Sequence, residues 1–196
     1  GHRQHQMCLR ERAQGISVDE QSQSVNIINN TVFNCANNGI KVHNAKDVFI
    51  SKNTLFNNGA QLRLEQDHYM PTITYIRNNN IKNNIFFSKT DAQPTSKLSS
   101  HQDDVSSFGN LDSNFYCRPL NELSDINISI VRNGQNLEQN YDLIGWKTAY
   151  GKDINSKISP TTISSYKISQ LIGANKFPGV NFYQDINNLY WYSTIN

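Results

Sequence analysis

The stretch VNIINNTVFN, residues 25–34, returns as VFISKNTLFN at residues 48–57, an offset of 48 − 25 = 23 positions. A third copy, TYIRNNNIKN at residues 74–83, follows after a further 74 − 48 = 26 positions. A repeat of roughly 20–30 residues is typical of a solenoid, because each unit buries its apolar side only against its neighbours. The repeat therefore predicts a stack of similar coils rather than an ordinary globular fold.

Each copy contains three short runs in which apolar residues alternate with other residues. The first runs occupy residues 15–19, 39–43 and 61–65, the second begin at Val25, Val48 and Thr74, and the third begin at Thr31, Thr54 and Asn80. Alternation predicts strands with one buried face. Because such runs are too short for ordinary helices, the pattern predicts a mainly β chain built as a parallel β-helix.

Asparagines separate these runs, often in pairs or next to glycine. Asparagine tolerates the left-handed backbone region and bonds nearby main chain, so it suits the turns between strands. Stacked coils also allow its amides to form ladders. The two columns that suit a ladder are Asn30/Asn53/Asn79 and Asn34/Asn57/Asn83. The alternative is that these residues only form turns, and both interpretations give the same architecture.

The pattern NNGI-x-V-x-NA-x-DV-x-I at residues 37–50, followed by NT-x-FNN, resembles right-handed parallel β-helix proteins of the pectate-lyase-like superfamily. Downstream, DSNFY (112–116), YDLIGWK (141–147) and GKDINS (151–156) resemble the C-terminal part of bacterial β-helix proteins that act on carbohydrates. The resemblance implies a right-handed solenoid located outside the cell or in the periplasm. It does not specify a substrate, because lyases, hydrolases, esterases and binding proteins share this fold.

Two regions are expected along the chain. Residues 1–120 should form the coils, with an N-terminal part missing, and residues 121–196 a C-terminal extension that caps the solenoid or starts a β-sandwich. In the extension we expect a hairpin from 126–133 and 135–144 and a short helix near 142–150, with Trp146 packing the helix on the coils. Both ends look cut, which indicates a fragment of a longer protein.

A Ser-rich stretch, residues 95–109, is predicted to be a loop between coils, where His101, Asp103 and Asp104 give only a weak cation site. We otherwise expect no metal and no cofactor, since no metal-ligand spacing and no phosphate-binding loop is present. Cys35 is expected to be a structural free thiol, with a Cys8–Cys35 bridge as the alternative.

Charge and hydropathy exclude two classes of partner. The net charge is +2, which gives no strong attraction to nucleic acid or to an anionic membrane. No apolar stretch approaches the roughly 20 residues of a membrane-spanning helix. The oligomeric state stays open.

The first strand of each coil carries the candidate site. Its inward residues are apolar, whereas its outward residues form two polar columns, Ser17–Lys41–Arg63 and Asp19–His43–Glu65, bordered by Glu20 and Asn44. Coils lie about 4.8 Å apart, so ionisable groups of both signs should share one rigid face. Such a face suits acid–base chemistry on a polymer that lies across the coils.

Asp19 and Glu65 are the candidate acid and base, and His43 would assist proton transfer. Their backbones should lie about 9–10 Å apart, near the carboxyl separation of about 6.5–9.5 Å in inverting glycosidases. Lys41 and Arg63 would hold or neutralise the substrate, as elimination from a uronate requires, and Glu20 and Asn44 would contact it. The alternative is a ladder of exposed ion pairs that contributes only about 0.2–1 kcal/mol per pair.

At these positions the sequence resembles two kinds of β-helix enzyme, each only in part. Gly15-Ile16-Ser17-Val18-Asp19 resembles the G-I-x-x-D strand of β-helix xylosidases, but the next coil offers His43 where a catalytic Glu is expected. Lys41 and Arg63 resemble the Lys/Arg pair of uronate lyases. We therefore expect part of a bacterial enzyme that degrades a polysaccharide or oligosaccharide, a glycoside hydrolase ahead of a lyase. The alternative is a non-catalytic β-helix that binds glycans or serves a structural role, as in adhesins and tailspikes.

Overall fold

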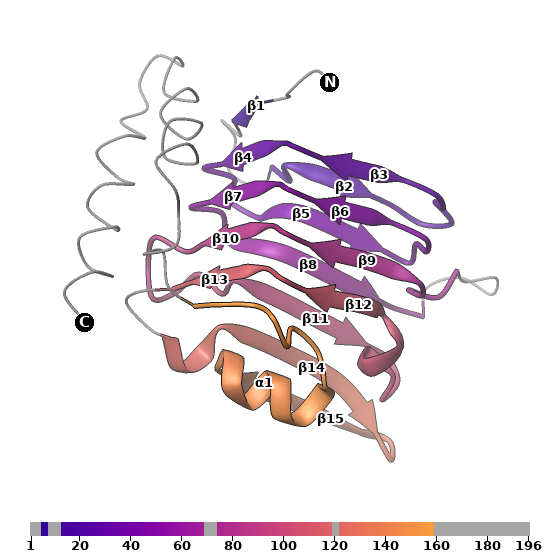
Figure 1. Cartoon of the computed structure of the whole chain (residues 1–196). Helices are drawn as coiled ribbons and strands as arrows, with labels where there is room; N and C mark the ends of the chain where they lie inside the picture. The colour runs from indigo at the N-terminus through magenta and orange to yellow at the C-terminus, as the bar shows by residue number, and fades with distance from the viewer. Residues whose placement is uncertain (1–4, 8–12, 69–73, 119–121, 159–196) are drawn as a thin grey trace.

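The computed structural model describes residues 5–7, 13–68, 74–118 and 122–158, which form stacked strands with a short helix at one end (Figure 1). The expectations for Cys8 and for the C-terminal extension beyond residue 158 concern residues outside this described part of the chain. Cys35 is disulfide-bonded, so the expectation of a free thiol at this position is wrong.

Three sheets contain the described strands. The β4 sheet contains β1 (His5–Met7), β4 (Thr31–Phe33), β7 (Thr54–Phe56), β10 (Ile85–Phe87) and β13 (Phe115–Cys117). The β5 sheet contains β2 (Ile16–Val18), β5 (Asn38–His43), β8 (Ala60–Gln66), β11 (Ser96–Ser100), β14 (Ile126–Arg132) and β15 (Gln135–Tyr141). The β6 sheet contains β3 (Asn26–Ile28), β6 (Phe49–Ser51), β9 (Asn79–Lys82) and β12 (Gly109–Asp112).

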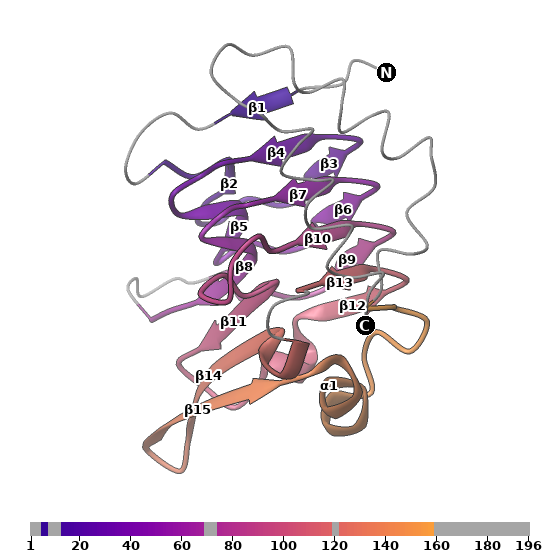
Figure 2. The same cartoon turned by 90° about the vertical axis from the view of Figure 1, so that its left-hand side faces the viewer.

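Neighbouring strands pair in parallel, except that β14 and β15 form an antiparallel hairpin. The view in Figure 2 shows the strands of each sheet one above the other. The expectation of a mainly β chain with parallel sheets is therefore confirmed.

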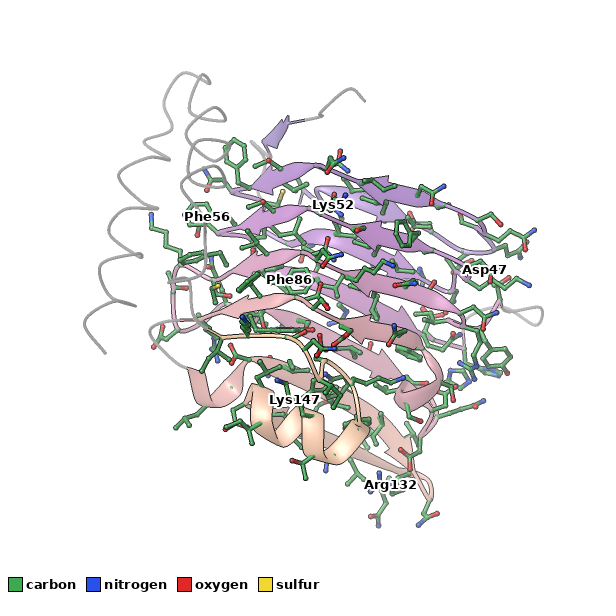
Figure 3. The ribbon with its side chains drawn as sticks, in the orientation of Figure 1. Asp47, Lys52, Phe56, Phe86, Arg132 and Lys147 are labelled. Carbon is green, nitrogen blue, oxygen red and sulfur yellow. The ribbon has the colours of Figure 1, made fainter. Side chains whose placement is uncertain are left out.

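One buried apolar cluster draws side chains from all three sheets, among them Ile40, Ile50, Leu55 and Phe86. Figure 3 shows Phe86 within this stack of strands. Over residues 40–43 of β5 and 62–65 of β8, burial alternates as the sequence predicted. Apolar residues thus face the cluster, and their polar neighbours are left on the outer face of the sheet.

The third coil is aligned differently from the sequence prediction. Ile50 pairs with Ile81 and not with Ile76, so the step is 81 − 50 = 31 residues. The chain uses additional residues between β8 and β9 before it returns to the β6 sheet. Ile76 is fully buried in the core cluster although it lies outside any strand.

The Ser-rich stretch is not a simple loop. Ser96–Ser100 is strand β11, and Val105–Ser107 is a 3₁₀ helix. The strand was missed because Leu98 is its one apolar residue, so no alternation is visible. Downstream of it, Asp104 pairs with Arg77 and Asp103 pairs with Arg132, each at 2.6 Å. Both carboxylates thus have guanidinium partners instead of forming the weak cation site.

A buried amide ladder connects successive coils. Asn30 donates to Asn53, Asn53 to Asn84 and Asn84 to Asn114, each at 3.0 Å between side-chain nitrogen and oxygen. Each accepting oxygen also receives the backbone N–H of the preceding ladder residue. The predicted ladder is therefore confirmed for Asn30 and Asn53, whereas its third member is Asn84 and not Asn79.

The second predicted column forms only between its first two members. Asn57 donates to Asn34 at 2.7 Å. The Asn57 side-chain oxygen then accepts from Gln93, so Gln93 contacts Asn57 from the next coil.

Asp153 ends the main ladder. Its carboxylate accepts bonds from Asn114, Tyr116, Trp146 and Ser156. Burial raises the pKa of Asp153, although all four bonds oppose that rise. The carboxylate therefore joins the last coil to the segment that follows it.

The hairpin and helix of the C-terminal extension are confirmed. After the hairpin, the helix α1 (Leu143–Tyr150) is capped by Asp142, which accepts from the Gly145 N–H, and Gly151 follows it in the left-handed conformation. Trp146 is buried and packs in the core cluster as predicted. Within the described residues, no helix has the length and apolarity needed to cross a bilayer.

Replacing Asn84 by Ala tests the ladder. The substitution leaves the Asn53 N–H and the Ile50 carbonyl without their bonds to Asn84, so we expect the free energy of unfolding to fall by about 2–4 kcal/mol. Urea unfolding measures the change. The control is Asn110→Ala, at an exposed position of strand β12, which should change stability by no more than about 0.5 kcal/mol. Equal losses in both variants would contradict the ladder.

Candidate functional site

The outer face of the β5 sheet aligns the candidate residues in the predicted register. Ser17 pairs with Lys41, Lys41 with Arg63, and His43 with Glu65. Asp19 lies just beyond the end of β2. The row continues on β11, where Lys97 pairs with Arg63. Lys41, Arg63 and Lys97 therefore occupy equivalent positions on three adjacent strands.

Glu65 is held between two cations of this row. Its Oε2 lies 2.8 Å from Lys41 Nζ, and its Oε1 lies 2.9 Å from the Arg63 guanidinium. Burial raises the pKa of Glu65, but the hydrogen bonds and charges of Lys41 and Arg63 outweigh that effect, so the pKa is lowered overall. The geometry thus stabilises the ionised carboxylate.

A pocket of about 420 Å³ lies over this part of the face. Its lining is strongly polar and consists of Gln14, Ala36, Asn37, Asn38, Lys41, Gly59, Ala60, Arg63, Glu65 and Lys97. Sequence analysis missed Lys97, because the strand that carries it was assigned to a loop. The signal that remains in the sequence is Leu98 beside it, which pairs with Leu64.

His43 contacts three other carboxylates. Its Nε2 lies 2.7 Å from Asp67 Oδ2, and its Nδ1 lies 3.8 Å from Asp19 Oδ1 and 4.0 Å from Glu20 Oε1. Asp67 was not identified from the sequence, since it lies two positions beyond the repeated run 61–65 and has no counterpart in the predicted columns. The imidazole is therefore surrounded by carboxylates, whereas Glu65 contacts cations.

Asn44 differs from the other candidates because its side chain is 1% exposed. Its Nδ2 donates to Asp67 Oδ1 at 2.7 Å, and its Oδ1 accepts from the Gln66 amide and the Asp67 backbone N–H. Asn44 thus holds Asp67 in place and does not reach the outer surface. By contrast, the Asp19 side chain is 69% exposed.

The comparisons with known proteins support the fold. The model of the family described as right handed beta helix region matches residues 11–116. Neither the curated proteins nor the solved structures gave a match.

A double-mutant cycle with Lys41→Met and Glu65→Gln measures the ion pair. At neutral pH we expect a favourable coupling of about 0.5–1 kcal/mol, because the pair is only partly shielded from water. Folding lowers the pKa of Glu65. The coupling should therefore be complete above the pKa of the unfolded chain and disappear as the pH falls through the pKa of the folded protein. A coupling of zero at neutral pH, or one that persists in acid, would contradict this arrangement.

Proposed function

Since the chain belongs to the right-handed β-helix family, we propose that its three sheets are the faces of one right-handed solenoid whose β5 sheet binds a carbohydrate polymer. The polymer lies across the strands and meets an equivalent row of side chains on each coil, about 4.8 Å apart. Binding takes place outside the cell or in the periplasm. The observation that carries the proposal is the polar pocket lined by Lys41, Arg63, Glu65 and Lys97.

The reaction that we propose is hydrolysis of a glycosidic bond. Asp19 and Glu65 supply the two carboxylates that this chemistry requires. Glu65 lies on strand β8, and Asp19 lies just beyond the end of β2 in the same sheet. Lys41 and Arg63 orient Glu65 through direct contacts. Polar groups at the pocket rim, such as Asn37 and Asn38, bond sugar hydroxyls. Elimination from a uronate ranks second, because the two cations that it would need already contact Glu65.

Glycan binding without cleavage is the candidate function from another class. One specific observation favours it: both oxygens of Glu65 are already engaged by Lys41 and Arg63. In a non-catalytic protein these contacts would keep the pocket rigid, and the polymer would be held by hydrogen bonds and by Lys97.

The test is incubation of the full chain with a panel of neutral and uronic polysaccharides. New reducing ends without the ultraviolet absorbance of an unsaturated product indicate hydrolysis, and reducing ends with that absorbance indicate elimination. Retained binding without cleavage indicates the non-catalytic protein. If the chain neither binds nor cleaves any of the polymers, hydrolysis, elimination and glycan binding without cleavage are all contradicted.

For hydrolysis, Asp19→Asn and Glu65→Gln should each lower turnover by about 10²-fold or more. The matched control is Asp103→Asn. The Asp103 carboxylate is exposed and contacts Arg132, which ends strand β14 at the turn of the β14–β15 hairpin. Unchanged turnover in both site variants would exclude the two carboxylates from the reaction.

A further inference from the structure

Three consecutive coils bring metal-ligand side chains together at one edge of the β5 sheet. Glu20 lies just beyond β2, His43 ends β5, and Asp67 directly follows β8. One ligand atom from each of these residues lies within 4.8 Å of the other two. The cluster is beside the polar pocket but shares none of the residues that line it.

The two carboxylates on the β2 side of this edge, Asp19 and Glu20, are not balanced by Lys or Arg side chains of the described residues. Among the described residues, the ion pairs of Asp19 and Glu20 are with His43 alone. Elsewhere on the surface Glu65, Asp103 and Asp104 each contact a Lys or Arg. Like charges held this close together repel one another even in water. A bound cation would remove that repulsion.

The imidazole distinguishes this cluster from a group of surface acids. The His43 side chain is only 15% exposed, and both of its ring nitrogens face carboxylate oxygens. Metal-binding histidines commonly coordinate through one nitrogen while carboxylates and amides around them fix the orientation of the ligands. Here the buried Asn44 amide fixes Asp67, so two of the three donors are held before any ion arrives.

We propose that Glu20, His43 and Asp67 bind one divalent transition-metal ion of the Zn²⁺ type. A donor set of one imidazole nitrogen and two carboxylates suits such an ion. It suits Ca²⁺ poorly, because Ca²⁺ takes six to eight oxygen ligands. The bound ion links three successive coils. As a ligand, His43 is not available for proton transfer, so this inference is independent of the proposed function and leaves Asp19 and Glu65 for the reaction.

Calorimetric titration of the chelator-treated full chain with Zn²⁺ tests the site. His2 and His5 are first changed to Ala, because these histidines lie in the sequence near the N-terminus and could bind Zn²⁺ on their own. We expect one saturable site, weakened at least about 10-fold by His43→Gln, by Asp67→Asn and by Glu20→Gln. Asp103→Asn is the matched control and should bind as the parent does. Circular dichroism of each variant checks that the fold is intact.

A second readout is the midpoint of thermal unfolding. Zn²⁺ should raise it in the parent and in Asp103→Asn, and not in His43→Gln, because a ligand that binds only the folded chain stabilises it. The proposal is overturned if the parent shows no saturable site or if His43→Gln and Glu20→Gln bind Zn²⁺ as tightly as the parent. Tighter binding of Ca²⁺ than of Zn²⁺ would overturn the assigned class of metal.

Discussion

The stacking of buried amides between coils is the constraint on which the rest of the structure depends. Asn53 and Asn84 are almost fully buried, and a buried amide without partners is costly. Each donates to the next amide and to a strand carbonyl. These bonds can form only when one coil lies directly over the next. The ladder therefore fixes the register of the turns, and the turns fix where each strand begins.

That register determines which side chains meet on the outer face. Because β5, β8 and β11 pair in parallel in one continuous register, Lys41, Arg63 and Lys97 form one row, and Glu65 contacts the first two of these cations. The carboxyl ends of the same strands collect Glu20, His43 and Asp67. Two groups of opposite charge thus arise on one sheet from the same stacking, one rich in cations and one rich in carboxylates.

Local patterns predicted most of this arrangement, and contacts between coils account for the rest. Alternating apolar residues identified β5 and β8 and their outward residues, and the spacing of the first two copies gave the correct partner for Ile27. The third copy failed because a longer connection moved the pairing from Ile76 to Ile81. Lys97 lies on a strand of mostly serine, where burial depends on neighbours rather than on hydrophobicity. The orientation of the His43 ring is set by its contact with Asp67, and Asp67 has no counterpart in the predicted columns.

Glycan binding on the outer face of the β5 sheet is tested most directly by an NMR titration of the labelled chain with oligosaccharides of the polymer that it binds. We expect shifts concentrated in residues 38–43, 60–66 and 96–100, in one contiguous row over the pocket. Shifts confined to the β4 or β6 sheet, with the signals of Lys41, Arg63 and Lys97 unchanged at saturation, would contradict it.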